Sequence, residues 1–249
     1  MVIGSPQCAS ETANSGTIVY IDGLNFYNAV RGTSNKWVDF GEIGRRLTAS
    51  GDLLKCTKYF TAQISGKATE DPQSPQRHRL LIRAAQATED VEVIEGKFQV
   101  PDHWRSLSKG RWPNLVRPEI PEEVISENAD HFATHTERPW KVRVQLPQEK
   151  FTDVAIGVHL VRDLNQGRCS KAIVVTNDAD LTPAIQLSVT DGFEVGVISP
   201  DRVVSRDLAG AASWSRPMRA DLPEQCQLPG TVTASNGRQI HKPEAWRKV

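Results

Sequence analysis

Short apolar runs alternate along the chain with segments whose apolar residues recur at helical spacing. Runs rich in β-branched and aromatic residues are typical of buried strands, and they occur at 17–21, 53–63, 91–94, 171–176 and 194–198. Helical segments separate these five runs, and strands that alternate with helices favour a parallel sheet with right-handed crossovers. The pattern therefore predicts an α/β fold.

The helical segments are recognised by apolar residues that share one face. Val154, Val158, Val161 and Leu164 lie on one side of a helix that Gly167 ends. Other helices are predicted over 24–30, 40–47, 76–88, 183–189 and 203–212. Each helix can then pack one apolar face on the sheet.

The segment 97–150 breaks this regular pattern. It holds six of the fifteen prolines and three of the six tryptophans. Residues 140–146 alternate apolar and polar positions, which predicts a half-buried strand that pairs with 97–100 as a β-hairpin. Because a structureless loop of this length is unusual inside a domain, the inserted arm is either a local subdomain or a functional flap.

These patterns divide the chain into three parts. Residues 1–15 are small and polar and are predicted to be disordered, and residues 16–212 form one domain that contains the insertion. Residues 213–249 contain four prolines and are predicted to be an extended C-terminal tail.

Composition excludes several classes of protein. Of 249 residues, 39% are hydrophobic and 24% are charged, which is typical of a globular protein. No run approaches the roughly 18–20 apolar residues that span a bilayer, and the N-terminus lacks the features of a signal peptide. The four cysteines are scattered and are interpreted as unpaired thiols of a cytoplasmic protein. Thirty basic and thirty acidic residues balance, so net charge neither favours nor excludes a phosphate substrate.

Four aspartates stand where an α/β fold exposes side chains. Asp22 follows the first apolar run, Asp178 and Asp180 follow the fourth, and Asp153 stands at a helix start. The carboxyl ends of parallel strands meet at the edge where open α/β sheets bind ligands. Converging carboxylates need a hard divalent cation, which predicts a metal-dependent nuclease. Helix capping is the alternative explanation for each aspartate.

Two further residues could assist the aspartates. Asn25 lies within reach of Asp22, and Lys150 precedes Asp153 by three residues. Lys150 could approach a scissile phosphate, or it could simply pair with an acid or lie in solvent.

Basic and aromatic residues suggest a surface for single-stranded nucleic acid, on which phosphates are neutralised and bases are stacked. The candidate RNA-binding residues are Arg77, Arg79, Arg83, Lys109, Arg111, Trp104 and Trp112. Ordinary surface charge over small apolar patches is the alternative. The motifs GxSxG, GxxxxGK[ST] and GxGxxG are absent from the sequence.

Three stretches together resemble the NYN domain family, a branch of the PIN-like nucleases that includes the LabA-like bacterial proteins. They are residues 20–27 (YIDGLNFY), 149–156 (EKFTDVAI) and 176–183 (TNDADLTP), and the resemblance extends over residues 16–212. It implies a three-layer α/β/α sandwich whose central parallel sheet has the strand order 3-2-1-4-5.

The resemblance also implies a site and a reaction. Mg²⁺ or Mn²⁺ would be held by Asp22, Asp153, Asp178 and Asp180, with Asn25 and Thr176 as supporting groups. The implied protein is a metal-dependent endoribonuclease that hydrolyses RNA, with single-stranded RNA as partner and a homodimer as a further expectation. A non-catalytic RNA-binding module and another phosphate-handling enzyme on the same fold are the alternatives.

Overall fold

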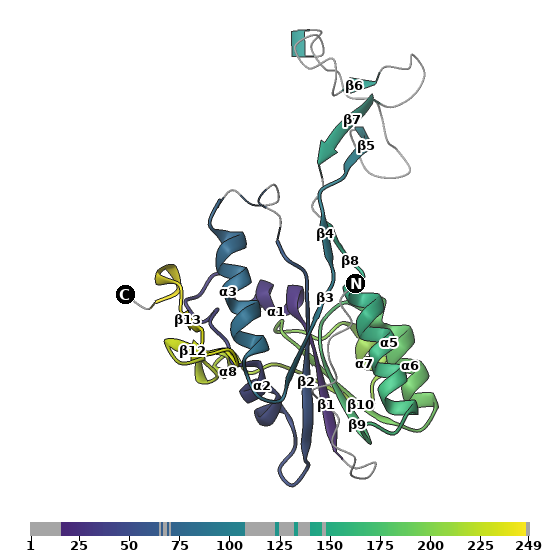
Figure 1. Cartoon of the computed structure of the whole chain (residues 1–249). Coiled ribbons are helices and arrows are strands. Elements are labelled where there is room, and N and C mark those ends of the chain that lie inside the picture. Colours follow the sequence, from purple (N-terminus) through teal and green to yellow (C-terminus); the bar gives the residue numbers. More distant parts are fainter. Residues whose placement is uncertain are drawn as a thin grey trace.

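The protein is built on a six-stranded, fully parallel sheet, seen in a computed structural model that describes residues 16–64, 66, 69, 71–107, 123–124, 132–133, 140–145 and 148–247 (Figure 1). The strands are β1 (Thr17–Asp22), β2 (Leu54–Thr61), β3 (Val91–Glu95), β9 (Lys171–Val175), β10 (Glu194–Ser199) and β11 (Trp214–Pro217). Their order across the sheet is β11-β10-β9-β1-β2-β3. β1 and β9 are neighbours, so the strand ends that carry Asp22 and Thr176 lie side by side.

Helices cover both faces of the sheet. On one face lie α1 (Gly23–Val30), α2 (Phe40–Leu47) and α3 (Ser74–Gln86), which bury Phe26, Ile43 and Leu81 against alternate residues of β1 and β2. On the other face lie α5 (Thr152–Asn165), α6 (Thr182–Thr190) and α7 (Arg206–Ala211). The predicted three-layer α/β/α sandwich is confirmed.

The C-terminal segment corrects the prediction of an extended tail. Its first strand, β11, adds a sixth strand to the predicted order 3-2-1-4-5. The segment continues through α8 (Leu222–Gln225), the antiparallel pair β12 (Thr231–Thr233) and β13 (Gln239–His241), and the 3₁₀ turn η4 (Glu244–Trp246). Leu222, Leu228 and Trp246 are buried in the core beside α2. Proline misled the sequence interpretation because Pro223 lies in the first turn of α8, where its missing N–H costs nothing.

The insertion forms an arm that extends from the carboxyl edge of the sheet (Figure 1). Its base is the antiparallel pair β4 (Lys97–Gln99) and β8 (Gln148–Lys150). Farther out, β7 (Trp140–Gln145) lies between β5 (Asp102–Leu107) and β6 (Phe132–Ala133). The predicted pairing of 97–100 with 140–146 is therefore wrong. Pro101 lacks the N–H that an uninterrupted ladder would need, and the pairing restarts beyond it.

The described cysteines are of two kinds. Cys169 and Cys226 are free and buried, whereas Cys56 takes part in a disulfide bond, so the prediction of unpaired thiols is wrong for Cys56.

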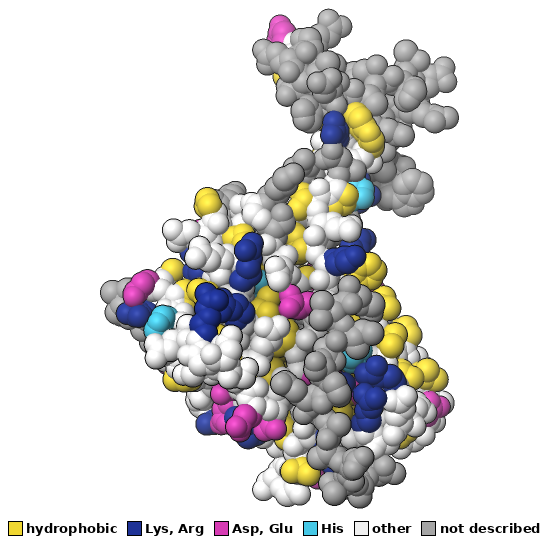
Figure 2. Space-filling view, viewed as in Figure 1, with side chains coloured by type: hydrophobic (Ala, Val, Ile, Leu, Met, Phe, Trp, Pro, Cys, Tyr) yellow, Lys and Arg dark blue, Asp and Glu magenta, His cyan; other side chains and the backbone are white. Residues whose placement is uncertain are grey.

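Within the described ranges, no helix is long and apolar enough to cross a membrane. Hydrophobic side chains gather over α5 and α6 (Figure 2), where Val154 and Leu187 are 70% and 49% exposed. The predicted disordered N-terminus, residues 1–15, lies outside the described residues.

Candidate functional site

Asp22 is the centre of a hydrogen-bond network at the carboxyl edge of the sheet. It is only 1% exposed because β1 ends there and α1 begins at the next residue. Its Oδ1 accepts a bond from the Asn25 backbone N–H (3.1 Å), and its Oδ2 accepts bonds from Asn25 Nδ2 (2.7 Å) and Thr176 Oγ1 (2.9 Å). Asn25 in turn accepts a bond from the backbone N–H of Asn177 through Oδ1 (3.2 Å). The structure thus joins the ends of β1 and β9 through Asp22, Asn25 and Thr176.

The two aspartates after β9 are placed by tight local bonds. The backbone N–H of Asp178 donates to Thr176 Oγ1 (3.1 Å), and Asp178 Oδ1 accepts from the backbone N–H of Asp180 (3.0 Å). Asp178 therefore caps the 3₁₀ turn η3 (Ala179–Leu181). The capping explanation is correct for Asp178, and it leaves its second carboxylate oxygen available.

Asp153 lies near Asp22 and Asp178 but belongs to α5, on the other face of the sheet from α1. It lies in the first turn of α5, directly after the arm returns through β8. Phe151, the residue before the helix, has a positive φ of 77°, an unusual angle for a bulky residue. That turn places Glu149, the middle residue of β8, beside Thr152, whose hydroxyl donates to Glu149 Oε1.

The five carboxylates Asp22, Glu149, Asp153, Asp178 and Asp180 form what we call the acidic cluster. Burial, and with it repulsion from Asp22, Asp178 and Asp180, raises the pKa of Asp153 to about 6. Burial also raises the pKa of Glu149 to about 7, with repulsion from Asp22 and Asp153 in the same direction and the Thr152 bond opposing it. The pKa of Asp22 is raised by burial and by Asp178, against the hydrogen bonds it accepts. Groups that hold protons near neutral pH are typical of functional sites.

Glu149 is the member of the cluster that the sequence interpretation missed. It belongs to one of the three stretches that carry the resemblance, yet no role was assigned to it. A usable signal was present, because a carboxylate three residues before a helix-starting threonine can bond to that hydroxyl. Its neighbour Lys150 is exposed, and successive strand residues point to opposite faces. The expected approach of Lys150 to the aspartates is therefore not observed.

The donor set of the cluster is oxygen only, which suits Mg²⁺ or Mn²⁺ rather than a softer metal. In the present arrangement, however, no three His, Cys, Asp or Glu side chains of the described part of the chain stand close enough to hold one ion. The carboxylates are near enough to shift one another's pKa without converging on one point.

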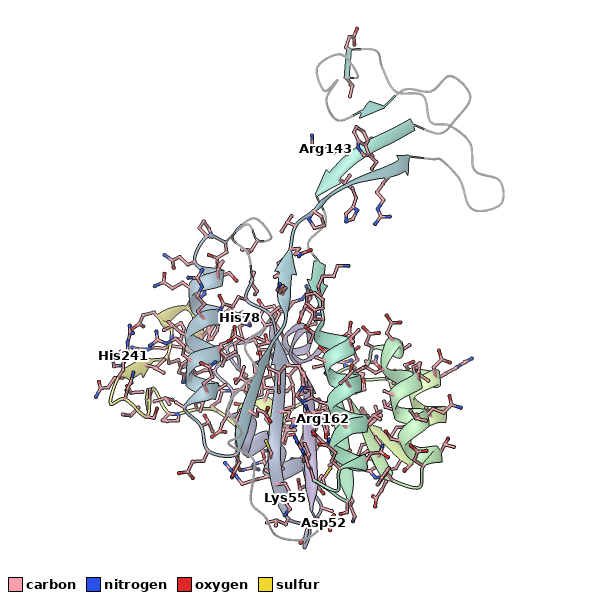
Figure 3. All side chains as sticks on the ribbon, turned by 45° about the vertical axis from the view of Figure 1, so that its right-hand side comes forward. Asp52, Lys55, His78, Arg143, Arg162 and His241 are labelled. Carbon is pink, nitrogen blue, oxygen red and sulfur yellow. The ribbon has the colours of Figure 1, made fainter. Side chains whose placement is uncertain are left out.

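The residues predicted to bind RNA do not come together. Arg77, Arg79 and Arg83 lie on α3, and the Arg77 side chain pairs with Asp71. Trp104 is 49% exposed on β5 of the arm, a strand that pairs with the arm strand carrying Arg143 (Figure 3). Lys109, Arg111 and Trp112 fall outside the described residues.

Known proteins give two matches to this chain. The 6-hydroxy-3-succinoylpyridine 3-monooxygenase HspA of Pseudomonas putida (strain DSM 28022 / S16) is 30% identical over an alignment of 260 positions, which covers 92% of this chain and 75% of the relative. The crystal structure of a protein of unknown function, VPA0982 from Vibrio parahaemolyticus RIMD 2210633, aligns with 86% of this chain and 98% of its own at 15% identity and a TM-score of 0.46. No family model matches the chain.

The relationship to a monooxygenase overturns the predicted activity. The metal-dependent endoribonuclease is contradicted, because the named relative is a monooxygenase. An α/β sheet edge with carboxylates does not specify a reaction by itself, which is why the error arose. The resemblance to the NYN family, the RNA partner and the homodimer stay predictions. The broader prediction of an enzyme holds, since this chain belongs to the family of the 6-hydroxy-3-succinoylpyridine 3-monooxygenase HspA.

Proposed function

We propose that this chain is a monooxygenase that acts on a hydroxylated pyridine. The observation that carries the proposal is the 30% identity to HspA over 92% of the chain. HspA is named for a substrate that joins a pyridine ring, a hydroxyl group and a succinoyl group. We assign the same class of substrate, an oxygenated nitrogen heterocycle, to this protein.

A monooxygenase places one atom of O₂ in its substrate and releases the other as water. The reaction consumes two electrons and two protons, so a two-electron donor must be supplied. We assign this role to a reduced nicotinamide or a reduced flavin from solution. A ring that carries a hydroxyl group becomes richer in electrons when it loses the hydroxyl proton, and an electron-rich ring reacts more readily with an oxidant.

The acidic cluster supplies the proton transfers in this proposal. Glu149, whose pKa is raised to about 7, can accept the proton of the substrate hydroxyl near neutral pH and return it later. Asp22 is held by Asn25 and Thr176 and fixes the position of the site between β1 and β9. Positioned general acid–base groups contribute about 10²- to 10⁴-fold to a rate.

We also propose that the cluster takes up Mg²⁺ or Mn²⁺ when substrate is present. Asp22, Asp153, Asp178 and Asp180 would hold the ion, and the chemistry of an all-oxygen donor set fits it. A divalent cation would neutralise the repulsion that raises the pKa of Asp153 and would favour an ionised substrate hydroxyl.

The test is turnover of 6-hydroxy-3-succinoylpyridine by the purified protein under ¹⁸O₂, with NADH, NADPH or reduced FMN, before and after addition of Mg²⁺ or Mn²⁺ to chelator-treated enzyme. We expect a product that carries one ¹⁸O atom, as measured by mass spectrometry. The rate should fall at least ~100-fold in Glu149→Gln.

Asp191→Asn is the matched control, because Asp191 is an exposed carboxylate in the turn after α6. It should turn over substrate at the wild-type rate. Absence of labelled product with every donor and metal would contradict the proposed function, and an unchanged rate in Glu149→Gln would remove the cluster from it.

A further inference from the structure

A groove runs along the edge strand β11, between this strand and α2, and reaches the amino edge of the sheet. It consists of two adjoining hollows of about 410 Å³ and about 170 Å³ that share Arg46, Leu47 and Arg216 as lining residues. Thr17 and Lys171, the first residues of β1 and β9, line the larger hollow. Asp52 also lines it, and Figure 3 places Asp52 at the end of the sheet opposite the arm. The larger volume is in the range of sites for small organic ligands.

One wall of the groove is an immobilised indole. Trp214 on β11 pairs with Gly196 on β10, and a Cβ atom at position 196 would lie 2.1 Å from Trp214 Cζ2. Glycine is therefore required there for the ring to lie against the strand. The indole Nε1 also donates to Glu194 Oε1 (3.1 Å), which fixes the ring at its other end. A rigid aromatic wall binds planar rings with little loss of conformational freedom.

The groove also carries one guanidinium whose charge is uncompensated. Arg216 is exposed, its Cζ lies 6.0 Å from the Trp214 ring centroid, and it makes no ion pair with any residue that the structure describes. By contrast, Arg46 pairs with Glu42 (2.8 Å), and Arg219 pairs with Asp221 (2.6 Å).

The acidic residues of the wall do not neutralise Arg216. Lys171 pairs with Asp52 (2.9 Å) and approaches Glu194 (3.6 Å), so these two carboxylates already share a cation. Leu47 and Leu222 supply an apolar floor to the smaller hollow. The groove thus presents the positive charge of Arg216, which no described carboxylate neutralises, beside an aromatic wall and an apolar floor.

We propose that this groove binds a planar aromatic carboxylate. The guanidinium fork of Arg216 matches a carboxylate with two parallel hydrogen bonds, and the ring of the ligand would lie against Trp214. Arg46 and Arg219 add a positive field across the mouth, although each is already paired. None of the residues that line the groove belongs to the acidic cluster, so this binding stands or falls separately from the proposed oxygenation.

Three probes separate the parts of this ligand, and binding is measured by isothermal titration calorimetry on the full chain. Nicotinate carries ring and carboxylate, nicotinamide carries the ring without charge, and acetate carries the charge without ring. We expect nicotinate to bind at least ~10-fold more tightly than either of the others, which corresponds to about 1.4 kcal/mol.

Arg216→Gln should weaken nicotinate at least ~10-fold and leave nicotinamide unchanged, since an exposed side chain can be replaced without unfolding the protein. Trp214→Phe should weaken nicotinate and nicotinamide by the same factor. Arg202→Gln, an exposed arginine in the turn after β10, is the matched control and should bind nicotinate as wild type does. Absence of nicotinate binding, equal affinity for the three probes, or an unchanged affinity in Arg216→Gln would overturn the proposal.

Discussion

Two aspartates of the described chain are almost completely buried, and their surroundings are opposite. Asp163 on α5 is surrounded by cations: Lys58 Nζ lies 2.5 Å from its Oδ2, and Arg168 Nη1 lies 3.3 Å from its Oδ1. The Tyr20 hydroxyl donates to it as well (3.0 Å). Asp22 at the carboxyl edge receives only neutral donors, and its charged neighbours are carboxylates.

The difference separates a structural charge from a functional one. The charge of a buried carboxylate with cationic partners is neutralised by those partners. Removal of one member of such a pair leaves the charge of the other buried and unpaired in a low-dielectric interior. A buried carboxylate among other carboxylates is uncompensated and lowers the stability of the folded state. Such an arrangement is retained at sites that bind a cation or move protons. The structure thus assigns stability to Asp163 and marks Asp22 as a candidate for function.

The largest expected effect on stability is at Asp163, the aspartate with cationic partners. Asp163→Asn should lower the free energy of unfolding by about 3 kcal/mol or more, because Lys58 is 2% exposed, would lose its closest anion and would keep only the more distant Glu92 (3.4 Å). Urea unfolding followed by circular dichroism measures it. Asp191→Asn, at an exposed position, should change stability by less than about 0.5 kcal/mol. Equal stability of the two variants would contradict the structural role of Asp163.

A smaller loss is expected when the cation is removed instead. In Lys58→Met, Asp163 keeps Arg162 (3.4 Å) and Arg168 (3.3 Å) as partners, so its charge stays compensated. We expect a loss of about 1–3 kcal/mol in the same urea experiment. A larger loss than that of Asp163→Asn would show that Lys58 contributes through something other than this ion pair.

The surroundings of Asp22 could be predicted from the sequence, whereas those of Asp163 could not. Asp22 and Asp178 follow apolar runs that could only be strands, so their meeting at the sheet edge was predictable from pattern alone. Lys58 was not, because a lysine inside a strand is usually solvated, and its partner Asp163 lies 105 positions away. Glu149 was missed because β8 is three residues long and belongs to the irregular insertion.

The packing of the C-terminal segment and the reaction could not be predicted from the sequence, for a different reason. Proline content suggested an extended tail, but burial of residues such as Trp246 is decided by tertiary packing rather than by local pattern. The activity was mispredicted because carboxylates at a sheet edge are compatible with several chemistries.

The acidic cluster should also give stability a particular dependence on pH. Unfolded Asp and Glu titrate near pH 4. The pKa values of Asp153 and Glu149 in the folded protein are raised to about 6 and about 7, so the folded state binds their protons more tightly. Their contribution to stability is therefore complete below about pH 4 and is lost as pH rises through 6 to 7.

The measurement is the free energy of unfolding at several pH values for wild type and for the double variant Asp153→Asn/Glu149→Gln. The difference between the two proteins should favour the variant increasingly from pH 4 to pH 7, and it should shrink when Mg²⁺ or Mn²⁺ is added. A difference that does not change with pH would show that the two carboxyls titrate normally.

The most direct test of the central claim is Asp22→Asn, measured both for turnover of 6-hydroxy-3-succinoylpyridine and for urea unfolding. Asparagine keeps the size of the side chain and can still accept the Thr176 bond, while it removes the charge that meets Asp178. We predict that activity falls at least ~100-fold while the free energy of unfolding stays equal to wild type or rises. Full activity, or loss of activity that merely follows a loss of stability like that of Asp163→Asn, would contradict a functional role for the acidic cluster.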